Sequence, residues 1–185
     1  MNLVVFLLEE QSMKVFLENY LPRRFPALKY QCIAHQGKND LEKSIPRKLR
    51  AWKEPLYIIA RDNDGSDCIA LKSRLTELCT SAGKSDCKIR IVCQSLEAWY
   101  LGAPSIVAKE YNCNKLIEVM RKRKNRNSDL IPNPDKFLQQ YIPDYRKIDG
   151  ARRLGQSMPL NQEENSSSSF RIFMKTIELI SEHQQ

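Results

Sequence analysis

The sequence lacks several signatures that would assign it to a common class. Its six cysteines never occur as C-x-x-C, so we predict neither a zinc knuckle nor a disulfide framework, and we expect reduced, mostly buried thiols. No G-x-x-x-x-G-K-[ST] and no Rossmann glycine signature is present, so a nucleotide site of either type is unsupported. The first apolar run covers only residues 3–8 and is followed by two glutamates, which is typical of neither a signal peptide nor a membrane span. We therefore expect a cytoplasmic protein without membrane contact.

The chain has a surplus of positive charge. Its 185 residues fit one domain with its own core, and 30 Lys and Arg against 22 Asp and Glu give a formal charge of +8. Such a charge favours polyanionic partners, nucleic acid in particular. A basic surface that only keeps the protein soluble would have the same composition, so charge does not decide between the two interpretations.

Residues 1–103 alternate between strand and helix patterns. The helix following the first strand has Ser12 as its expected cap and Pro22 as its end, and the next begins near Asp40. Pro46 predicts either a kink or a helix that restarts at Ser44, and Gly83 closes the third helix. This alternation predicts an α/β fold with about four mainly parallel strands and helices on both sheet faces. The strands are expected at residues 3–8, 27–35, 55–60 and 88–93.

Residues 104–185 show weaker patterns, and we expect a helical extension that packs on the core within a single domain. Helices are predicted through residues 106–111 and over 115–127, followed by a Pro-rich stretch at 132–143. A polar linker or cap then leads into a closing helix with an apolar face. The inward residues of that face are Phe170, Phe173, Ile177 and Ile180.

Titratable side chains follow all four predicted strands. The carboxyl ends of parallel strands meet at one sheet edge, where ligands bind in open α/β folds. So many carboxylates repel one another unless a cation neutralises them, and oxygen ligands favour Mg²⁺ or Mn²⁺. We predict Glu9, Asp62 and Asp64 as metal ligands. The complete set, in strand order, is Glu9 and Glu10, His35 and Lys38, Asp62, Asp64 and Asp67, and Glu97.

Each of these residues also has an ordinary interpretation. Asp-Asn-Asp-Gly is a good turn, Asp67 can cap the next helix, and Glu9 can be a strand-end charge in water. Their joint occurrence at two strand ends favours the metal site. His35 could shuttle a proton and Lys38 could contact phosphate, or both could belong to a polar loop.

Glu97 either lies near the metal or begins a helix, and we expect its aromatic neighbours, Trp99 and Tyr100, to be core residues. We therefore predict no catalytic or binding role for Trp99 and Tyr100.

Two basic segments could contact a nucleic-acid backbone. One is the basic face of the predicted helix at 40–52, and the other is the run at 121–126. A solvated helix end explains the second run equally well, and phosphate contacts carry no base specificity in any case. The candidate phosphate contacts are Lys38, Arg47, Lys48, Arg50, Arg121, Lys122, Arg123 and Lys124.

An acid after the first strand and D-x-D after the third resemble the Toprim domain of topoisomerases, primases and OLD-type nucleases. The matching residues are Glu9, Asp62 and Asp64. Longer segments, among them "HQGKNDLEKSIPRKLRAW", "RDNDGSDC" and "LEAWYLG", look like domain-of-unknown-function family 4276, a bacterial Toprim-like family. The resemblance implies a Toprim-like fold and metal-dependent cleavage of DNA or RNA, often beside an ATPase partner in anti-phage defence.

The sequence departs from the resemblance at two positions. Met13 stands where many OLD-type nucleases have a second acid, and Ala103 stands where relatives often have Asp. One metal ion is therefore expected rather than two.

The leading hypothesis is a nuclease in which Glu10 or His35 accepts the proton of the attacking water. The alternative is a catalytically silent subunit that binds nucleic acid or regulates an ATPase. A haloacid dehalogenase phosphatase is disfavoured, because its nucleophilic acid follows the first strand.

Overall fold

Four parallel strands form the centre of the protein, in the order β2-β1-β3-β4. The computed structural model describes residues 3–182. β1 pairs on both sides, with β2 and with β3, and β3 also pairs with β4. The strand bounds are β1 (Val4–Leu8), β2 (Tyr30–Ala34), β3 (Leu56–Asp62) and β4 (Lys88–Val92).

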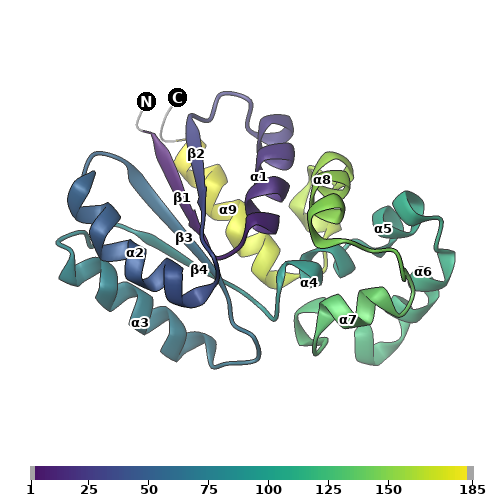
Figure 1. The fold of residues 1–185 in the computed structure, drawn as a ribbon. Coiled ribbons are helices and arrows are strands. Elements are labelled where there is room, and N and C mark those ends of the chain that lie inside the picture. Colours follow the sequence, from purple (N-terminus) through teal and green to yellow (C-terminus); the bar gives the residue numbers. More distant parts are fainter. Residues whose placement is uncertain (1–2, 183–185) are drawn as a thin grey trace.

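Helices cover both faces of this sheet, so every residue of β1 is buried (Figure 1). α2 (Lys38–Ala51) and α3 (Cys68–Ser81) lie on one face, and α1 (Gln11–Arg24) and α9 (Ser168–Glu182) lie on the other. Alternate residues of β1 enter two separate apolar clusters, one on each face, as expected for a continuously apolar parallel strand. The predicted fold class is confirmed.

A group of short helices lies beside the sheet and joins it through α1 and α4 (Figure 1). α9 leaves this group and returns to the sheet, where it packs against β4. The proposed division at residue 103 stays a prediction. The remaining bounds are α4 (Leu96–Leu101), α5 (Pro104–Tyr111), α6 (Asn114–Arg121), α7 (Pro134–Gln139) and α8 (Lys147–Ser157), with 3₁₀ turns η1 (Arg123–Asn125), η2 (Ser128–Leu130) and η3 (Gln162–Glu164).

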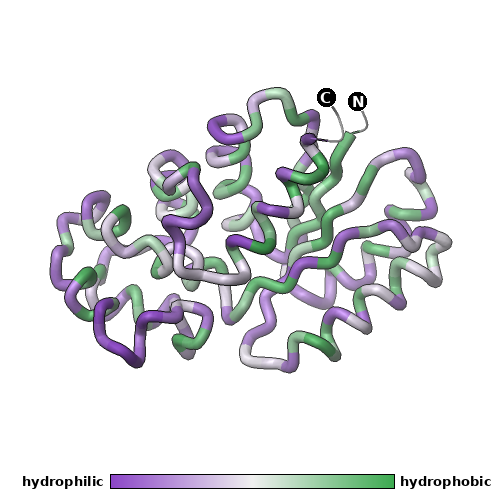
Figure 2. Tube along the Cα trace, turned by 180° about the vertical axis from the view of Figure 1, so that it is seen from behind, coloured by the Kyte–Doolittle hydropathy of each residue, from purple (hydrophilic) through white to green (hydrophobic). Residues whose placement is uncertain are grey.

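The hydropathy of each segment corresponds to its position in the sheet or in the outer helices. Figure 2 shows the sheet strands as the most continuously hydrophobic segments, while the outer helices alternate between hydrophobic and hydrophilic positions. In α9, Phe170, Phe173, Ile177 and Ile180 are buried, which confirms the predicted face of the closing helix. Trp99 and Tyr100 are fully buried and belong to the core, also as predicted.

Several predicted helix boundaries were wrong. α1 has Glu10 rather than Ser12 at its N-cap, and it continues through Pro22, whose missing N–H costs only one hydrogen bond in the last turn. α2 runs unbroken through Pro46 and has Gly37 at its N-cap, while Asp40 lies within the first turn. Asp67 does cap α3, since its side chain accepts a hydrogen bond from the Ala70 N–H at 2.7 Å.

The second half of the chain holds more helix than its sequence pattern indicates. The basic run is helical only as far as Arg121, after which it forms a 3₁₀ turn. The Pro-rich stretch contains α7, which begins with a proline at a position where no backbone N–H is needed. α8 was not predicted at all. Its buried positions include Gly150 and Gly155. Because glycine has no apolar side chain, these positions do not contribute to the spacing of apolar residues that indicates a helix.

All six cysteines are free thiols, as predicted, although burial is less complete than expected. Cys32 and Cys79 are buried, and the other four are half-buried. Among the residues described, no helix is both long and apolar enough to cross a membrane.

We expect Gly155→Ala to destabilise the contact between α1 and α8. A Cβ at this position would lie 2.8 Å from both the carbonyl oxygen of Phe16 and the Cβ of Asn19, which forces the two helices apart. The free energy of unfolding should fall by about 1–3 kcal/mol in urea titrations. Arg152→Ala, at an exposed position of the same helix, should change it by less than about 0.5 kcal/mol. Equal stabilities for the two variants would contradict this packing.

Candidate metal and phosphate site

The ends of β1 and β3 bring two predicted ligands into contact. Glu9 is only 8% exposed, and its Oε2 accepts a hydrogen bond from the backbone N–H of Asp62 at 3.1 Å. This contact follows from the register, because Leu8 pairs with Ala60 and places the next residues of both strands at the same edge. The central spatial expectation from the sequence therefore holds for Glu9 and Asp62.

Both carboxyl groups have raised pKa values. For Glu9 the main cause is burial, aided by the charges of Asp64 and Glu10, which together outweigh the Asp62 hydrogen bond and Arg61. For Asp62 the pKa lies well above its ordinary range because of burial and then the charges of Glu9, Glu97, Glu10 and Asp64. Burial and the neighbouring carboxylates therefore both disfavour the charged forms of Glu9 and Asp62.

A small cavity lies between these acids. It measures about 10 Å³, which is roughly the space that one water molecule requires. Its lining residues are Glu9, Glu10, Ser12, Met13, Ala60, Asp62 and Leu96. Within residues 3–182, however, no three His, Cys, Asp or Glu side chains already converge as a ready-made metal site. Glu9 and Asp62 are neighbours, and a third ligand would have to move toward them.

Asp64 occupies the exposed turn after β3. Its φ of 48° is left-handed, and its backbone N–H donates to the Gln94 carbonyl at 3.3 Å. Its charge acts on both Glu9 and Asp62, so it is electrostatically part of the cluster. The segment therefore forms a turn, as its composition indicates, and it also lies at the acidic edge of the sheet.

Asn63 holds this turn against the loop that follows β4. Its Oδ1 accepts the Gln94 N–H at 2.5 Å, and its Nδ2 donates to the Ser66 carbonyl at 2.8 Å. The side chain is almost completely buried. The sequence pattern identified Asn63 only as a turn residue and missed this role.

Glu97 is buried at the edge with both oxygens hydrogen-bonded. Ser95 donates to Oε2 at 2.7 Å, and Tyr145 donates to Oε1 at 2.9 Å. The Tyr145 ring fits here because Gly150 lacks a Cβ, which would lie 2.3 Å from that ring. The charge of Glu97 reaches Asp62, which agrees with the predicted place of Glu97 near the cluster.

Lys147 is the residue of this edge that the sequence pattern did not identify. It is the first residue of α8, and its Nζ lies 3.6 Å from Oε2 of Glu10. Burial lowers its pKa, but Glu97, Glu10, Asp135 and Asp62 more than compensate, so the net pKa is raised. A cation thus stands among the acids. A lysine 50 residues beyond the last predicted acid gives no sequence signal for this position.

Arg61 and His35 are held by other groups. The Arg61 guanidinium forms an ion pair with Glu42, while its Nε lies 3.8 Å from Oε2 of Glu9. His35 is buried, with Nδ1 2.8 Å from the Leu8 carbonyl and Nε2 2.5 Å from the Ser44 hydroxyl. A proton shuttle needs a free ring nitrogen, so the geometry favours His35 as a clamp for the end of β1.

The predicted phosphate contacts lie in two separate places. Lys38 begins α2 next to Gly37, whose N–H donates to the Glu9 carbonyl at 3.0 Å, so Lys38 lies close to the acids. Arg47 and Lys48 line a hollow of about 540 Å³ beside His35, whereas Arg50 is exposed and donates to the Ser81 carbonyl. The second group, Arg121, Lys122, Arg123 and Lys124, is exposed around the end of α6.

The chain belongs to the family called domain of unknown function DUF4276, whose model matches residues 8–178. A solved structure with a similar fold is the C-terminal region of the OLD protein of Xanthomonas campestris pv. campestris. The TM-score is 0.55 at 15% identity, and the match covers 98% of each chain. No curated protein matches the sequence. At this identity the likeness establishes the fold only.

The raised pKa of Asp62 predicts a pH-dependent effect of Asp62→Asn on stability. A carboxyl whose pKa rises on folding costs no stability below its unfolded pKa, near 4; the cost grows as pH rises from there toward the folded pKa and is constant above it. The substitution removes this cost. We expect Asp62→Asn to raise the free energy of unfolding at pH 7.5 by on the order of 1 kcal/mol and to have little effect at pH 4.

Urea titrations at the two pH values measure this difference. Asp86→Asn, at an exposed acid in the segment between α3 and β4, serves as the control. A destabilising Asp62→Asn at pH 7.5, or a benefit of equal size at both pH values, would contradict the electrostatic account.

Proposed function

We propose that the protein is a divalent-metal-dependent phosphodiesterase of Toprim type that cleaves DNA or RNA. The observation that carries this proposal is the contact of Glu9 with Asp62, whose pKa is raised well above its ordinary range by burial and by the charges of neighbouring carboxylates. A protein tolerates such repulsion at a strand edge when a cation offsets it. Membership in DUF4276 and the fold shared with an OLD-protein region support the same class.

The donor set fits Mg²⁺ or Mn²⁺. Its charged groups are all carboxylates, and hard cations of this size take oxygen ligands. Glu9 and Asp62 would hold the ion, with Asp64 joining from its exposed turn. Only Oε2 of Glu9 accepts a hydrogen bond among the described contacts, so Oε1 remains available. When bound, the ion polarises the scissile phosphate and lowers the pKa of an attacking water.

The protein side chains supply the remaining roles. Lys147 places an ammonium group among the acids, where it can stabilise negative charge that develops on a phosphate oxygen. Glu10 is about 43% exposed and lies beside Lys147, so it can accept the proton of the attacking water. Ser95 and Tyr145 keep Glu97 oriented toward Asp62.

A catalytically silent binding subunit is the second candidate, and one observation favours it. Met13 is buried and lines the small cavity beside Glu9 and Asp62, where an acid would supply a further ligand. A site with fewer carboxylates binds metal more weakly. The silent subunit would still use its basic surface to bind nucleic acid or a partner.

A partner protein forms part of the proposal. The solved neighbour is one region of a longer protein, which supports a fold that works beside another domain. An ATPase partner and a role in anti-phage defence remain predictions that follow from the family resemblance.

The decisive experiment is a Mn²⁺-dependent cleavage assay on plasmid DNA and on RNA. We expect Asp62→Asn/Asp64→Asn to lose both Mn²⁺ binding in calorimetry and about 100-fold or more of the cleavage rate. Lys147→Met should lose about 10- to 100-fold in rate while it retains Mn²⁺ binding. Lys88→Met, at the opposite end of the sheet, is the matched control. Equal background cleavage in native and double-variant chains would instead support the silent subunit.

The basic run should contribute to affinity through phosphate contacts. The logarithm of the affinity falls linearly with the logarithm of the salt concentration. We expect Lys122→Ala/Arg123→Ala/Lys124→Ala to make this slope shallower by about 3, measured in EDTA to prevent cleavage. The matched control is a triple substitution of other exposed cations, Lys29→Ala/Lys72→Ala/Lys88→Ala. An unchanged slope for the first variant would mean that the run is only a solvated helix end.

A further inference from the structure

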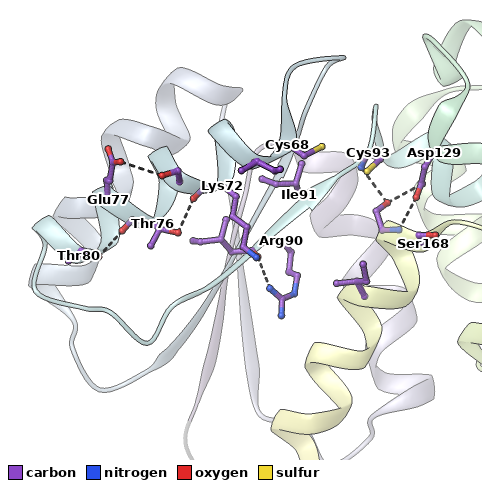
Figure 3. A pocket seen from close by; sticks show the side chains of 15 residues that line it. Cys68, Lys72, Thr76, Glu77, Thr80, Arg90, Ile91, Cys93, Asp129 and Ser168 are labelled. Carbon is purple, nitrogen blue, oxygen red and sulfur yellow. Dashed lines mark hydrogen bonds between the residues drawn. The ribbon is translucent and has the colours of Figure 1, made fainter.

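Two cysteine thiols lie near each other at the edge of the sheet. Cys68 is the first residue of α3, and Cys93 directly follows β4. Both are free and half-buried, and the neighbouring Cys68 contributes to the raised pKa of Cys93. Figure 3 shows the two sulfur atoms at the same end of one pocket. Both side chains line that pocket.

Asn63 fixes the two sulfur-bearing segments relative to each other. Its Nδ2 donates to the Cys68 Sγ at 3.3 Å, and its Oδ1 accepts the backbone N–H of Gln94, the neighbour of Cys93, at 2.5 Å. The backbone N–H of Cys93 in turn donates to the Ser169 hydroxyl at 3.3 Å. The two cysteine-bearing segments are thus held beside each other by hydrogen bonds.

Small oxidants can reach this pair. Both thiols line an open groove of about 780 Å³ between α3, β4 and α9. Ile69 and Ile172, on the two helices, are 81% and 58% exposed beside it. The groove does not include the carboxylate cluster, so access to the thiols does not require access to the acids.

The segments that carry the two thiols also carry the candidate site. Residues 62–68 run from Asp62 and Asp64 to Cys68, and residues 93–97 run from Cys93 to Glu97. We propose that Cys68 and Cys93 are a redox modification site, whose reversible disulfide ties together the two loops that hold the acids. The disulfide stands on the thiol geometry alone, and its effect on metal binding rests on the proposed function.

A peroxide is the oxidant that we assign. The Cys68 thiolate attacks one peroxide oxygen, the O–O bond breaks, and a sulfenic acid forms with release of hydroxide, which is protonated to water. The Cys93 sulfur then attacks the Cys68 sulfur, forms the S–S bond and expels the sulfenic oxygen as a second water. Two thiols and one hydrogen peroxide thus give one disulfide and two waters. A dithiol reductant reverses the reaction by exchange.

The order of attack follows from the surroundings. Burial, together with the charge of Asp129 and the neighbouring Cys68, raises the pKa of Cys93 to about 12, so this thiol stays protonated at first. The sulfur of Cys68 receives the Asn63 amide hydrogen, and Cys68 is the first residue of α3. Cys68 is therefore the attacking thiol and Cys93 the resolving one.

A second thiol pair provides an internal comparison. Cys79 and Cys87 lie at the other ends of α3 and β4, and the neighbouring Cys79 lowers the pKa of Cys87. This pair spans the connection between α3 and β4, at the opposite end of the sheet from the acids. Its oxidation should leave the carboxylate cluster unaffected.

The test uses the full chain, freed of reductant and treated with hydrogen peroxide. Free thiols are alkylated, and the unreduced protein is digested and analysed by mass spectrometry. We expect a peptide that links Cys68 to Cys93 in the native chain and in Cys79→Ser/Cys87→Ser. In the latter variant, oxidation should raise the midpoint of thermal unfolding by roughly 5 °C or more. Its Mn²⁺ dissociation constant should fall several-fold, because the two loops are held together beforehand.

Three results would overturn parts of this proposal. Recovery of Cys68 and Cys93 as separate alkylated or over-oxidised residues would refute the disulfide. A linked peptide without change in the Mn²⁺ constant would refute the coupling to the site, as would an equal response in Cys68→Ser. A chain that binds no Mn²⁺ in either redox state would contradict the proposed function, while the peptide map still decides whether the disulfide forms.

Discussion

Mutual repulsion among the carboxylates at the carboxyl edge of the sheet is the constraint on which the rest of the structure depends. The parallel register of β1 and β3 forces Glu9 and Asp62 together, and the Glu9 side chain accepts the Asp62 backbone N–H. The protein offsets this charge only in part. Arg61 is engaged with Glu42, Lys147 is closest to Glu10, and the pKa values of Glu9 and Asp62 remain raised.

The helices beside the sheet complete this edge. Tyr145 and Lys147 come from the segment at the start of α8, and they contact Glu97 and Glu10 respectively. Gly150 leaves the space that the Tyr145 ring needs. The segment after residue 103 is therefore part of the site, and the contact between α1 and α8 determines where its groups lie. The fold shared with the OLD-protein region spans both parts of the chain.

The sequence was most informative where a local pattern determines the structure. Continuous apolar runs between amphipathic helices predicted the parallel sheet, and the position of acids at strand ends predicted the meeting of Glu9 and Asp62. Helix ends were less predictable, because Pro22 and Pro46 are tolerated inside α1 and α2 by tertiary packing that no local rule contains. The Pro-rich stretch hid α7 for a similar reason.

Long-range contacts were not predictable from one sequence. Lys147 reaches the acids only because α8 packs on α1, and Asn63 resembled a common turn residue until its bonds to Gln94 and Cys68 were seen. His35 was a reasonable proton carrier by residue type, yet Leu8 and Ser44 occupy both of its ring nitrogens. The chemistry of a side chain is visible in the sequence, while its partners depend on the fold.

The most direct measurement of the central claim is an anomalous difference map from a crystal of this protein soaked in Mn²⁺. The account predicts a peak at the carboxyl edge within about 2.2 Å of oxygens from Glu9 and Asp62. It also predicts that the peak disappears when magnesium is supplied in large excess. A crystal with ordered Glu9 and Asp62 side chains and no peak between them, at a Mn²⁺ concentration that fills other sites, would contradict the account.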